Sequence, residues 1–434
     1  MRGTRYRLSG IAVAVWTVSV VAGTAARPAN AQTLFEVDGS LSLRYSETTP
    51  ATAGESGLTT AVSPAITLQV GAPRLVFRVG YLFAGAFNVY GGGSNTYFNL
   101  LTFALAAEPS GSSMLTVAAS VSQGGAAFQL SERPADAGRP AIRPQDNPDQ
   151  LWATLSESFR WEVSRSLRMT QSFSAALVAL SYSLDQSNAQ ASISIGLDHV
   201  APRDAIGGVF SSSVALLRPL GGLGDPYYAL ANSLRATWSH DQNSIWNTEV
   251  WAGISHVTRL TQGQPDTFLP TGGITAGFLL SDVGRSGGSI GVAYGPTFDL
   301  QTGALTRAGT ITARGHVNFD SAATRQLAFS AGYLRSWAVS EAAVLSLAGV
   351  GQAVQGDVGF VWSLSTAFQA TVRASVAYQF GRPAELAPSL VYTFLLGITG
   401  RYSNAMHMPD VPTIGNRVDG ADGAGFPAAH SSWQ

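Results

Sequence analysis

The sequence contains no cysteine and no lysine, and it carries little charge for its length. All 26 basic residues of the 434-residue chain are arginine, and charged residues make up 12% of it. Soluble domains average about 25% charged residues. Without cysteine the chain has no disulfide framework, no thiolate metal ligand and no cysteine nucleophile. The net charge of −1 gives no overall field that would attract nucleic acid or anionic lipid, so no nucleic-acid partner is predicted.

Long apolar runs are missing after the first 31 residues, so no later segment could cross a membrane as a helix of about 20 residues. The first residues differ from the rest. A basic start containing Arg5 and Arg7 precedes the apolar stretch 11–22, and Ala29-Asn30-Ala31 fits a small-x-small cleavage site. This pattern predicts a signal peptide over residues 1–31, since a membrane anchor would need a longer apolar run. The mature protein is therefore expected to be exported.

Apolar and polar residues alternate along most of the remaining chain, which is typical of β-strands that face an apolar medium on one side. In the segment 367–380, Phe368 and Val372 fall on one face while Gln369 and Arg373 fall on the other. A soluble β-sandwich also alternates. However, its strands are usually about 5 or 6 residues long, and its outer faces carry lysine and glutamate that are scarce here.

The alternating segments predict 18 strands, with 16 to 20 as the range. Their connections alternate between long ones, such as 48–57 and 123–150, and short ones, such as 72–73 and 164–165. That rhythm is typical of transmembrane β-barrels. We therefore predict an all-β, closed, antiparallel transmembrane barrel over residues 32–403. The predicted strands are 34–47, 58–71, 74–87, 96–107, 113–122, 151–163, 166–180, 189–198, 206–218, 228–240, 243–257, 268–281, 287–299, 306–319, 324–337, 355–365, 367–380 and 388–402.

Aromatic residues lie near the ends of several segments on the apolar face, as in the girdles that mark the membrane interfaces of barrels. These residues are Tyr45, Trp161, Trp238, Trp246, Tyr294, Trp362, Tyr378 and Tyr402. With the alternation, they make the chain resemble outer-membrane β-barrel proteins of the porin type and, loosely, barrels that export exopolysaccharide. The resemblance implies contact with outer-membrane lipid and a periplasmic or polysaccharide-assembly partner. Unlike the family, this chain continues into residues 404–434, which we predict to be a disordered periplasmic tail.

The opposite face of each strand would line the lumen, and it consists mainly of small polar residues with scattered charges. Arginine recognises carboxylates and phosphates through paired hydrogen bonds, so this lining would favour anionic solutes or acidic sugars. Alternatively, the arginines pair with acidic residues of the wall and only neutralise the interior. The predicted pore-lining residues are Arg44, Arg78, Arg160, Arg168, Arg235, Glu249, Trp251, Arg314, His316, Arg373 and Arg401.

The external connection 338–354 is unusually apolar and rich in helix formers. Ser340 followed by Glu341 suits a helix start, and Gly349 suits a helix end. We predict a short helix over 338–349 that folds into the barrel mouth as a gate, because so apolar a segment is unsuited to a free loop. The predicted gate residues are Glu341, Val344, Leu345 and Leu347. The alternative is an extra hairpin in the wall, which would raise the number of strands to 20.

No arrangement of residues indicates catalysis, a metal site or a cofactor, because the six histidines have neither dyad nor ligand spacing. The chain is therefore not expected to be an enzyme. Three functions remain. The first is a channel for hydrophilic solute or polymer, most specifically an exopolysaccharide export pore, with a general or anion-leaning porin as the alternative. The second is a closed structural or adhesive barrel, and the third is a soluble exported β-sandwich or lectin.

Overall fold

The computed structural model describes the following residues: 32–49, 57–72, 74–90, 95–125, 149–180, 187–218, 226–242, 245–259, 266–281, 286–299, 304–320, 324–338, 351–380 and 389–403. Within these ranges all regular secondary structure is β-strand. The predicted signal peptide, 1–31, and the predicted tail, 404–434, lie outside the described residues. Both therefore stay predictions.

Eighteen strands form a single antiparallel sheet. They are β1 (Gln32–Thr49), β2 (Gly57–Ala72), β3 (Leu75–Tyr90), β4 (Thr96–Ser110), β5 (Ser113–Gly125), β6 (Asp149–Ser164), β7 (Leu167–Leu180), β8 (Ser187–Val200), β9 (Asp204–Leu217), β10 (Tyr227–Asp241), β11 (Trp246–Arg259), β12 (Thr267–Ser281), β13 (Ser286–Asp299), β14 (Ala304–Asn318), β15 (Arg325–Ala338), β16 (Gly351–Ser363), β17 (Phe368–Phe380) and β18 (Ser389–Ser403).

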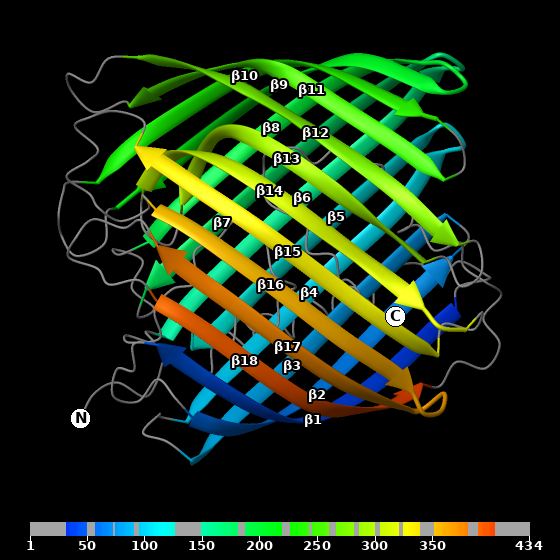
Figure 1. Cartoon of the computed structure of the whole chain (residues 1–434). Coiled ribbons are helices and arrows are strands. Elements are labelled where there is room, and N and C mark those ends of the chain that lie inside the picture. Colours follow the sequence, from blue (N-terminus) through cyan, green and yellow to red (C-terminus); the bar gives the residue numbers. More distant parts are fainter. Residues whose placement is uncertain are drawn as a thin grey trace, which may run out of the picture.

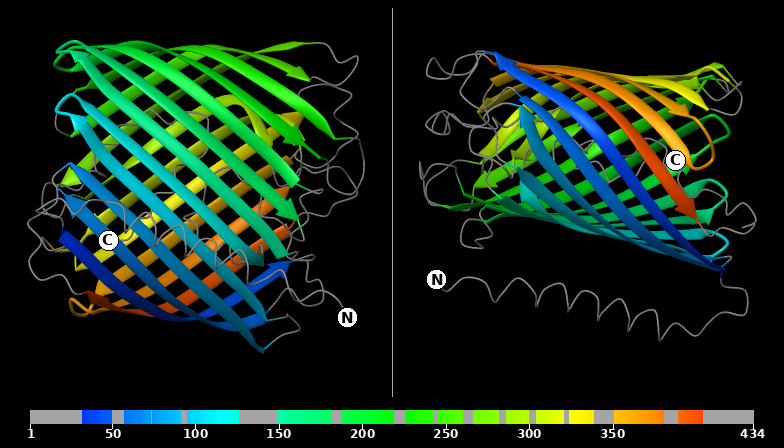
Figure 2. Two further views of the ribbon diagram at one scale, coloured as in Figure 1. Left: turned by 180° about the vertical axis from the view of Figure 1, so that it is seen from behind. Right: turned by 90° about the horizontal axis from the view of Figure 1, so that it is seen from below.

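The sheet closes on itself. Each strand pairs with its neighbours in sequence, and β1 pairs with β18 from Glu36↔Ser403 to Thr49↔Leu390. Figures 1 and 2 show the tilted strands winding around one closed barrel. The predicted 18-stranded barrel is thus confirmed. The β-sandwich alternative is wrong, because a sandwich would consist of two separate sheets with open edges.

The two faces of the wall differ as the alternation requires. On β1, Leu41 is 56% exposed on the outer surface, whereas Asp38, of opposite parity, is 7% exposed. Apolar outer residues on this strand run from Phe35 to Tyr45. Ten residues of strand rise about 33 Å, which a tilt of about 40° reduces to roughly 25 Å, the height of the apolar band of a membrane barrel. The outer surface therefore has both the chemistry and the height to face lipid.

The connection between β15 and β16 differs from the prediction at both ends. Ala338, predicted as helical, ends β15, and β16 begins at Gly351 rather than at 355. The two strands pair directly, from Ser336↔Gly351 onward. This direct pairing excludes an extra wall hairpin, so the alternative of 20 strands is wrong. The remainder of the predicted helix and gate lies outside the described residues, namely Glu341, Val344, Leu345 and Leu347.

Candidate functional site

Every predicted pore-lining residue lies on the inner face of the barrel. Residues directly opposite in an antiparallel ladder share a face. Trp161 and Leu197 are exposed on the outer surface. Their neighbours in sequence, Glu162 and Asp198, therefore point into the barrel. Arg168 lies opposite Glu162 in the β6–β7 ladder and opposite Asp198 in the β7–β8 ladder, so it points inward too. The same registers and parity place the other predicted residues, which come from β1, β3, β6, β10, β11, β14, β17 and β18.

The charged inner residues gather at one end of the barrel, which we call the short-turn end because β6 and β7, for example, are joined there by residues 165–166 alone. Arg168 is the second residue of β7, and Arg401 is the third residue from the end of β18. Arg44 and Arg259 are exceptions, since they lie toward the opposite end, the long-connection end. The short-turn half of the lumen is therefore the polar and charged half.

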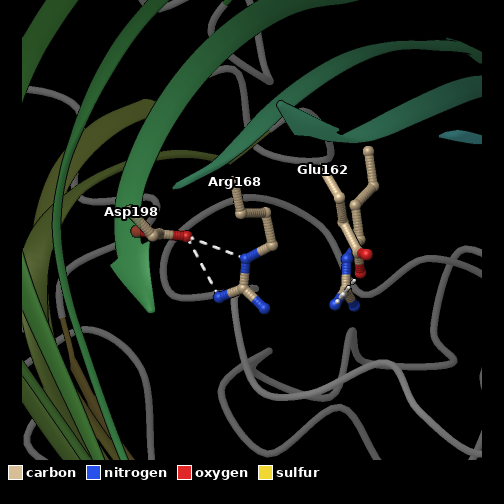
Figure 3. Close-up of polar contacts among 4 residues, drawn as sticks. Glu162, Arg168 and Asp198 are labelled. Atoms are coloured by element: carbon tan, nitrogen blue, oxygen red, sulfur yellow. Dashed lines mark hydrogen bonds and ion pairs between the residues drawn. The ribbon is translucent and has the colours of Figure 1, made fainter. Parts of the chain in front are cut away.

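Arg168 and Asp198 form an ion pair across the β7–β8 ladder. The Arg168 Nε and Nη2 atoms both donate to Asp198 Oδ2, at 3.2 and 3.1 Å. Figure 3 shows the two side chains reaching toward each other, with Glu162 beside them. On β9, a Cβ atom added to Gly207 would lie 2.0 Å from Asp198 Oδ1. Because Gly207 has no side chain, there is room at this position for the Asp198 carboxylate.

Other inner arginines also pair with acidic residues of the wall. Arg160 Nη2 lies 3.4 Å from Glu162 Oε1 on the same strand, and Arg373 Nε donates to Asp357 Oδ2. Arg401 Nε lies 2.8 Å from Glu36 Oε1 and 3.1 Å from Asp38 Oδ1, so this ion pair spans the β1–β18 seam that closes the barrel. These three arginines and Arg168 thus pair with acidic residues of the wall and only neutralise the interior, which is the alternative stated in the sequence analysis.

Arg235 and Arg314 have different surroundings. The Arg235 guanidinium carbon lies 5.3 Å from the centre of the Trp251 ring, a cation–π contact. The ring also lies against β12, where a Cβ added to Gly273 would be 2.6 Å from Trp251 Nε1. Arg314 Nε donates to Ser289 Oγ at 3.2 Å, and its side chain is exposed in the lumen. Its neighbour is thus a hydroxyl rather than a carboxylate.

The two inner tryptophans are buried in the wall. Trp251 is 6% exposed and Trp152 is 2% exposed. Neither ring therefore offers a free face on which a sugar could stack. Sequence reasoning also missed Asp357, Tyr227 and Arg259, although their parity places all three on the inner face. The Arg259 guanidinium lies 5.0 Å from the Tyr227 ring at the long-connection end.

The β13–β14 hairpin separates from β12 at the long-connection end, while β14 stays paired with β15 from Thr306↔Ala338 onward. The β12–β13 ladder stops at Gly272↔Tyr294, although β12 reaches back to Thr267. Meanwhile β13 stays paired with β14 as far as Asp299↔Ala304. Figure 1 shows the strong curvature of β13 on this side. We call residues 295–299 and 304–305 the inturned segment, because the contacts below place it inside the barrel.

The inturned segment packs on the inner side of β9–β12. Leu305 N donates to the hydroxyl of Tyr227 on β10 at 3.1 Å, although three strands separate β10 from β14 in the sheet. Leu305 shares the outer face of β14 with Ile311, which is 48% exposed, yet Leu305 is 2% exposed. It is covered by an apolar cluster whose inward-facing members include Leu217, Ala229, Val257 and Leu269. The mouth at this end is therefore narrowed by apolar packing.

Prolines account for the break in the ladder. Continuing the β12–β13 register by two residues would place Pro270 opposite Pro296. Neither residue has an N–H to donate, and proline is confined to strand edges and ladder breaks for that reason. The inturned segment is thus encoded locally, by two prolines on adjacent strands.

Within the described residues, no group of histidine and acidic side chains could hold a metal ion. Nor does that part of the chain contain a helix long and apolar enough to cross a membrane. Two histidines do pair with acids: His240 Nδ1 lies 2.8 Å from Asp204 Oδ1, and His256 Nε2 lies 3.1 Å from Asp266 Oδ2. Both histidines have the outer parity, and His240 stacks on Trp238 at that face. These pairs are therefore separate from the lumen.

No protein-family model matches the chain, and no curated protein matches it. Solved structures that resemble it include Pseudomonas aeruginosa OpdK with vanillate, with a TM-score of 0.45 and 12% identity over 86% of this chain and 99% of that one. For Pseudomonas aeruginosa OpdO the values are 0.45, 10%, 86% and 98%. For the CymD monoaromatic hydrocarbon channel they are 0.32, 10%, 85% and 88%. Similarity at this level assigns no function to the chain.

Proposed function

We propose that the protein is an outer-membrane channel for small hydrophilic solutes. One observation carries this proposal: a closed 18-stranded barrel has an apolar outer surface and a polar, charged inner face. A barrel of this size encloses an aqueous channel unless something fills it. The apolar band suits lipid, and the predicted signal peptide would bring the chain to the outer membrane.

The inner charges nearly balance, so they support no strong preference for ions of either sign. At the short-turn half, seven arginines of the strands face eight acidic residues, a formal balance of −1. Four of the arginines are held by carboxylates. These seven arginines are Arg78, Arg160, Arg168, Arg235, Arg314, Arg373 and Arg401, and the eight acids are Glu36, Asp38, Glu108, Glu162, Asp198, Asp241, Glu249 and Asp357.

A small solute suits this interior better than a polysaccharide. Sugar polymers are commonly bound by aromatic faces, and both inner tryptophans are buried. The inturned segment also narrows the long-connection end with apolar side chains. Among the described residues, no feature supports export of exopolysaccharide, which the sequence favoured.

Planar-bilayer recording tests the proposal. The refolded barrel should give stable conductance steps in potassium chloride, with a reversal potential near zero in a salt gradient. A barrel that inserts and gives no steps would be a closed structural or adhesive barrel instead. Recovery of the folded protein in the aqueous fraction without detergent would refute the membrane location itself.

A further inference from the structure

The outer surface carries one charged side chain deep in its apolar band, Glu157 on β6. In the ladders Glu157 lies opposite Val117 and Phe173, and it shares its face with Leu155 and Trp161. Leu155 and Trp161 are exposed on the outer surface. Every other charged residue on the outer face of the described strands lies within three residues of a strand end.

The position of Glu157 is energetically unfavourable for a carboxylate that faces lipid. Four residues of strand separate it from Trp161, about 13 Å along β6 and about 10 Å along the membrane normal. That depth is near the middle of an apolar band about 25 Å high. Glu157 makes no hydrogen bond or ion pair with any other described residue. Ionisable groups at such depth are expected to have a partner.

A complementary polar side chain lies next to Glu157. Gln171 on β7 is opposite Phe159 and Ile195 on the outer face, diagonal to Glu157. Its side chain likewise has no hydrogen bond within the described residues. The amide can donate two hydrogen bonds and the carboxylate can accept them. Diagonal neighbours lie about 7 Å apart, so the two groups are presented side by side without bonding to each other.

Outward alanines gather on the same strands beyond Glu157, toward the long-connection end, whereas the direct ladder neighbours of Glu157 are Val117 and Phe173. Elsewhere the outer face is dominated by leucine, isoleucine, valine and aromatic residues. Small residues at a membrane-facing surface let two backbones approach closely, and polar side chains then bond across the contact. The outward alanines of β5–β8 that lie beyond Glu157 are Ala119, Ala153, Ala175, Ala189 and Ala191.

We propose that the outer face of β5–β8 binds a second copy of this chain. Across a two-fold axis, the Glu157 carboxylate of each subunit accepts a hydrogen bond from Gln171 of the partner subunit. The same residues of both subunits then form the interface, as two-fold symmetry requires. Each copy supplies the donor that the other lacks, and the alanines allow the walls to meet. The inference rests on the membrane location proposed above and is independent of conduction.

Cysteine cross-linking tests the interface directly, because the natural chain has no cysteine. Ala175→Cys in reconstituted vesicles should give a covalent dimer on oxidation. Ala374→Cys, an outward alanine on β17 of the barrel, is the matched control and should give none. Native mass spectrometry of the wild type should show the dimer without any cross-link.

Variants of the polar pair separate an interface from a structural effect. Glu157→Leu should abolish most of the Ala175→Cys dimer while the barrel stays folded, as judged by its heat-modifiable migration. Gln171→Leu should do the same, and Glu157→Gln, which keeps an acceptor oxygen, should retain more dimer than Glu157→Leu. A monomeric wild type, or an undiminished dimer in Glu157→Leu, would overturn the inference. A conducting monomer would leave the proposed function standing, whereas a detergent-free soluble protein would end both.

Discussion

Single ion pairs set how much charge the lumen presents to a solute, and the pair of Arg168 and Asp198 offers the clearest case. Asp198→Asn would remove the negative charge and leave the guanidinium facing the lumen. A unit charge about 8 Å from a passing ion is worth roughly 0.5 kcal/mol in water. We therefore expect the chloride-to-potassium permeability ratio to rise about twofold at low salt, measured from reversal potentials in a potassium chloride gradient.

The control for this experiment carries the same change of charge outside the lumen. Asp204 lies at the start of β9 with outer parity, bonded to His240 and Trp238. Asp204→Asn should therefore leave the reversal potential unchanged. Arg168→Gln should shift the ratio toward potassium. If Asp198→Asn and Asp204→Asn gave the same shift, Asp198 would not contribute to the permeation path.

One carboxylate in a turn should make the stability of the barrel depend on pH. Asp320, between β14 and β15, accepts hydrogen bonds from Thr324 N and Thr324 Oγ1, both at 2.7 Å, and from Arg325 Nε at 3.3 Å. The bonds from Thr324 and then the charge of Arg325 lower the pKa of Asp320. A carboxyl whose pKa is lower when folded stabilises the fold above its unfolded pKa, and this contribution is lost as pH falls through the folded value.

Asp320→Asn should accordingly lower the urea midpoint of unfolding at pH 7 and have no effect well below pH 4, near the ordinary pKa of an aspartate. The midpoints of wild type and variant, followed by tryptophan fluorescence, should converge as the pH is lowered. A difference that is constant from pH 7 to pH 3 would mean that the ionised carboxylate is not the stabilising species.

At the scale of strands, the inturned segment should limit the conductance of the channel at its long-connection end. Pro270→Thr together with Pro296→Thr would restore two N–H donors where the β12–β13 ladder stops. The ladder could then extend and draw β13 back into the wall, so single-channel conductance should increase. Tyr227→Phe, which removes the hydroxyl that accepts from Leu305 N, should increase it less. Unchanged conductance in the double variant would show that this segment does not narrow the path.

The same strands show what the sequence could and could not predict. The strict alternation of apolar and polar residues identified all 18 strands. Each strand has one lipid-facing side, and a shift of one residue would turn every side chain to the wrong face, so the pattern holds along the whole strand. The break at Pro270 and Pro296 was not predicted, because these residues are opposite only once the register is known. Asp357 lies within the predicted strand 355–365, but its pairing with Arg373 on the neighbouring strand becomes plain only from the observed register of β16 and β17.

The whole molecule is asymmetric along its axis: fixed charges line the short-turn half, while an apolar cluster narrows the other end. An ion therefore meets the electrostatic field and the steric barrier in a different order from each side. Fields of fixed charges are screened over about 10 Å at 0.1 M salt and about 3 Å at 1 M. We expect current through a barrel inserted in one orientation to differ between the two voltage polarities at 0.1 M potassium chloride and to become nearly symmetric at 1 M. Asymmetry that persisted at 1 M would assign it to the shape of the mouth rather than to the charges.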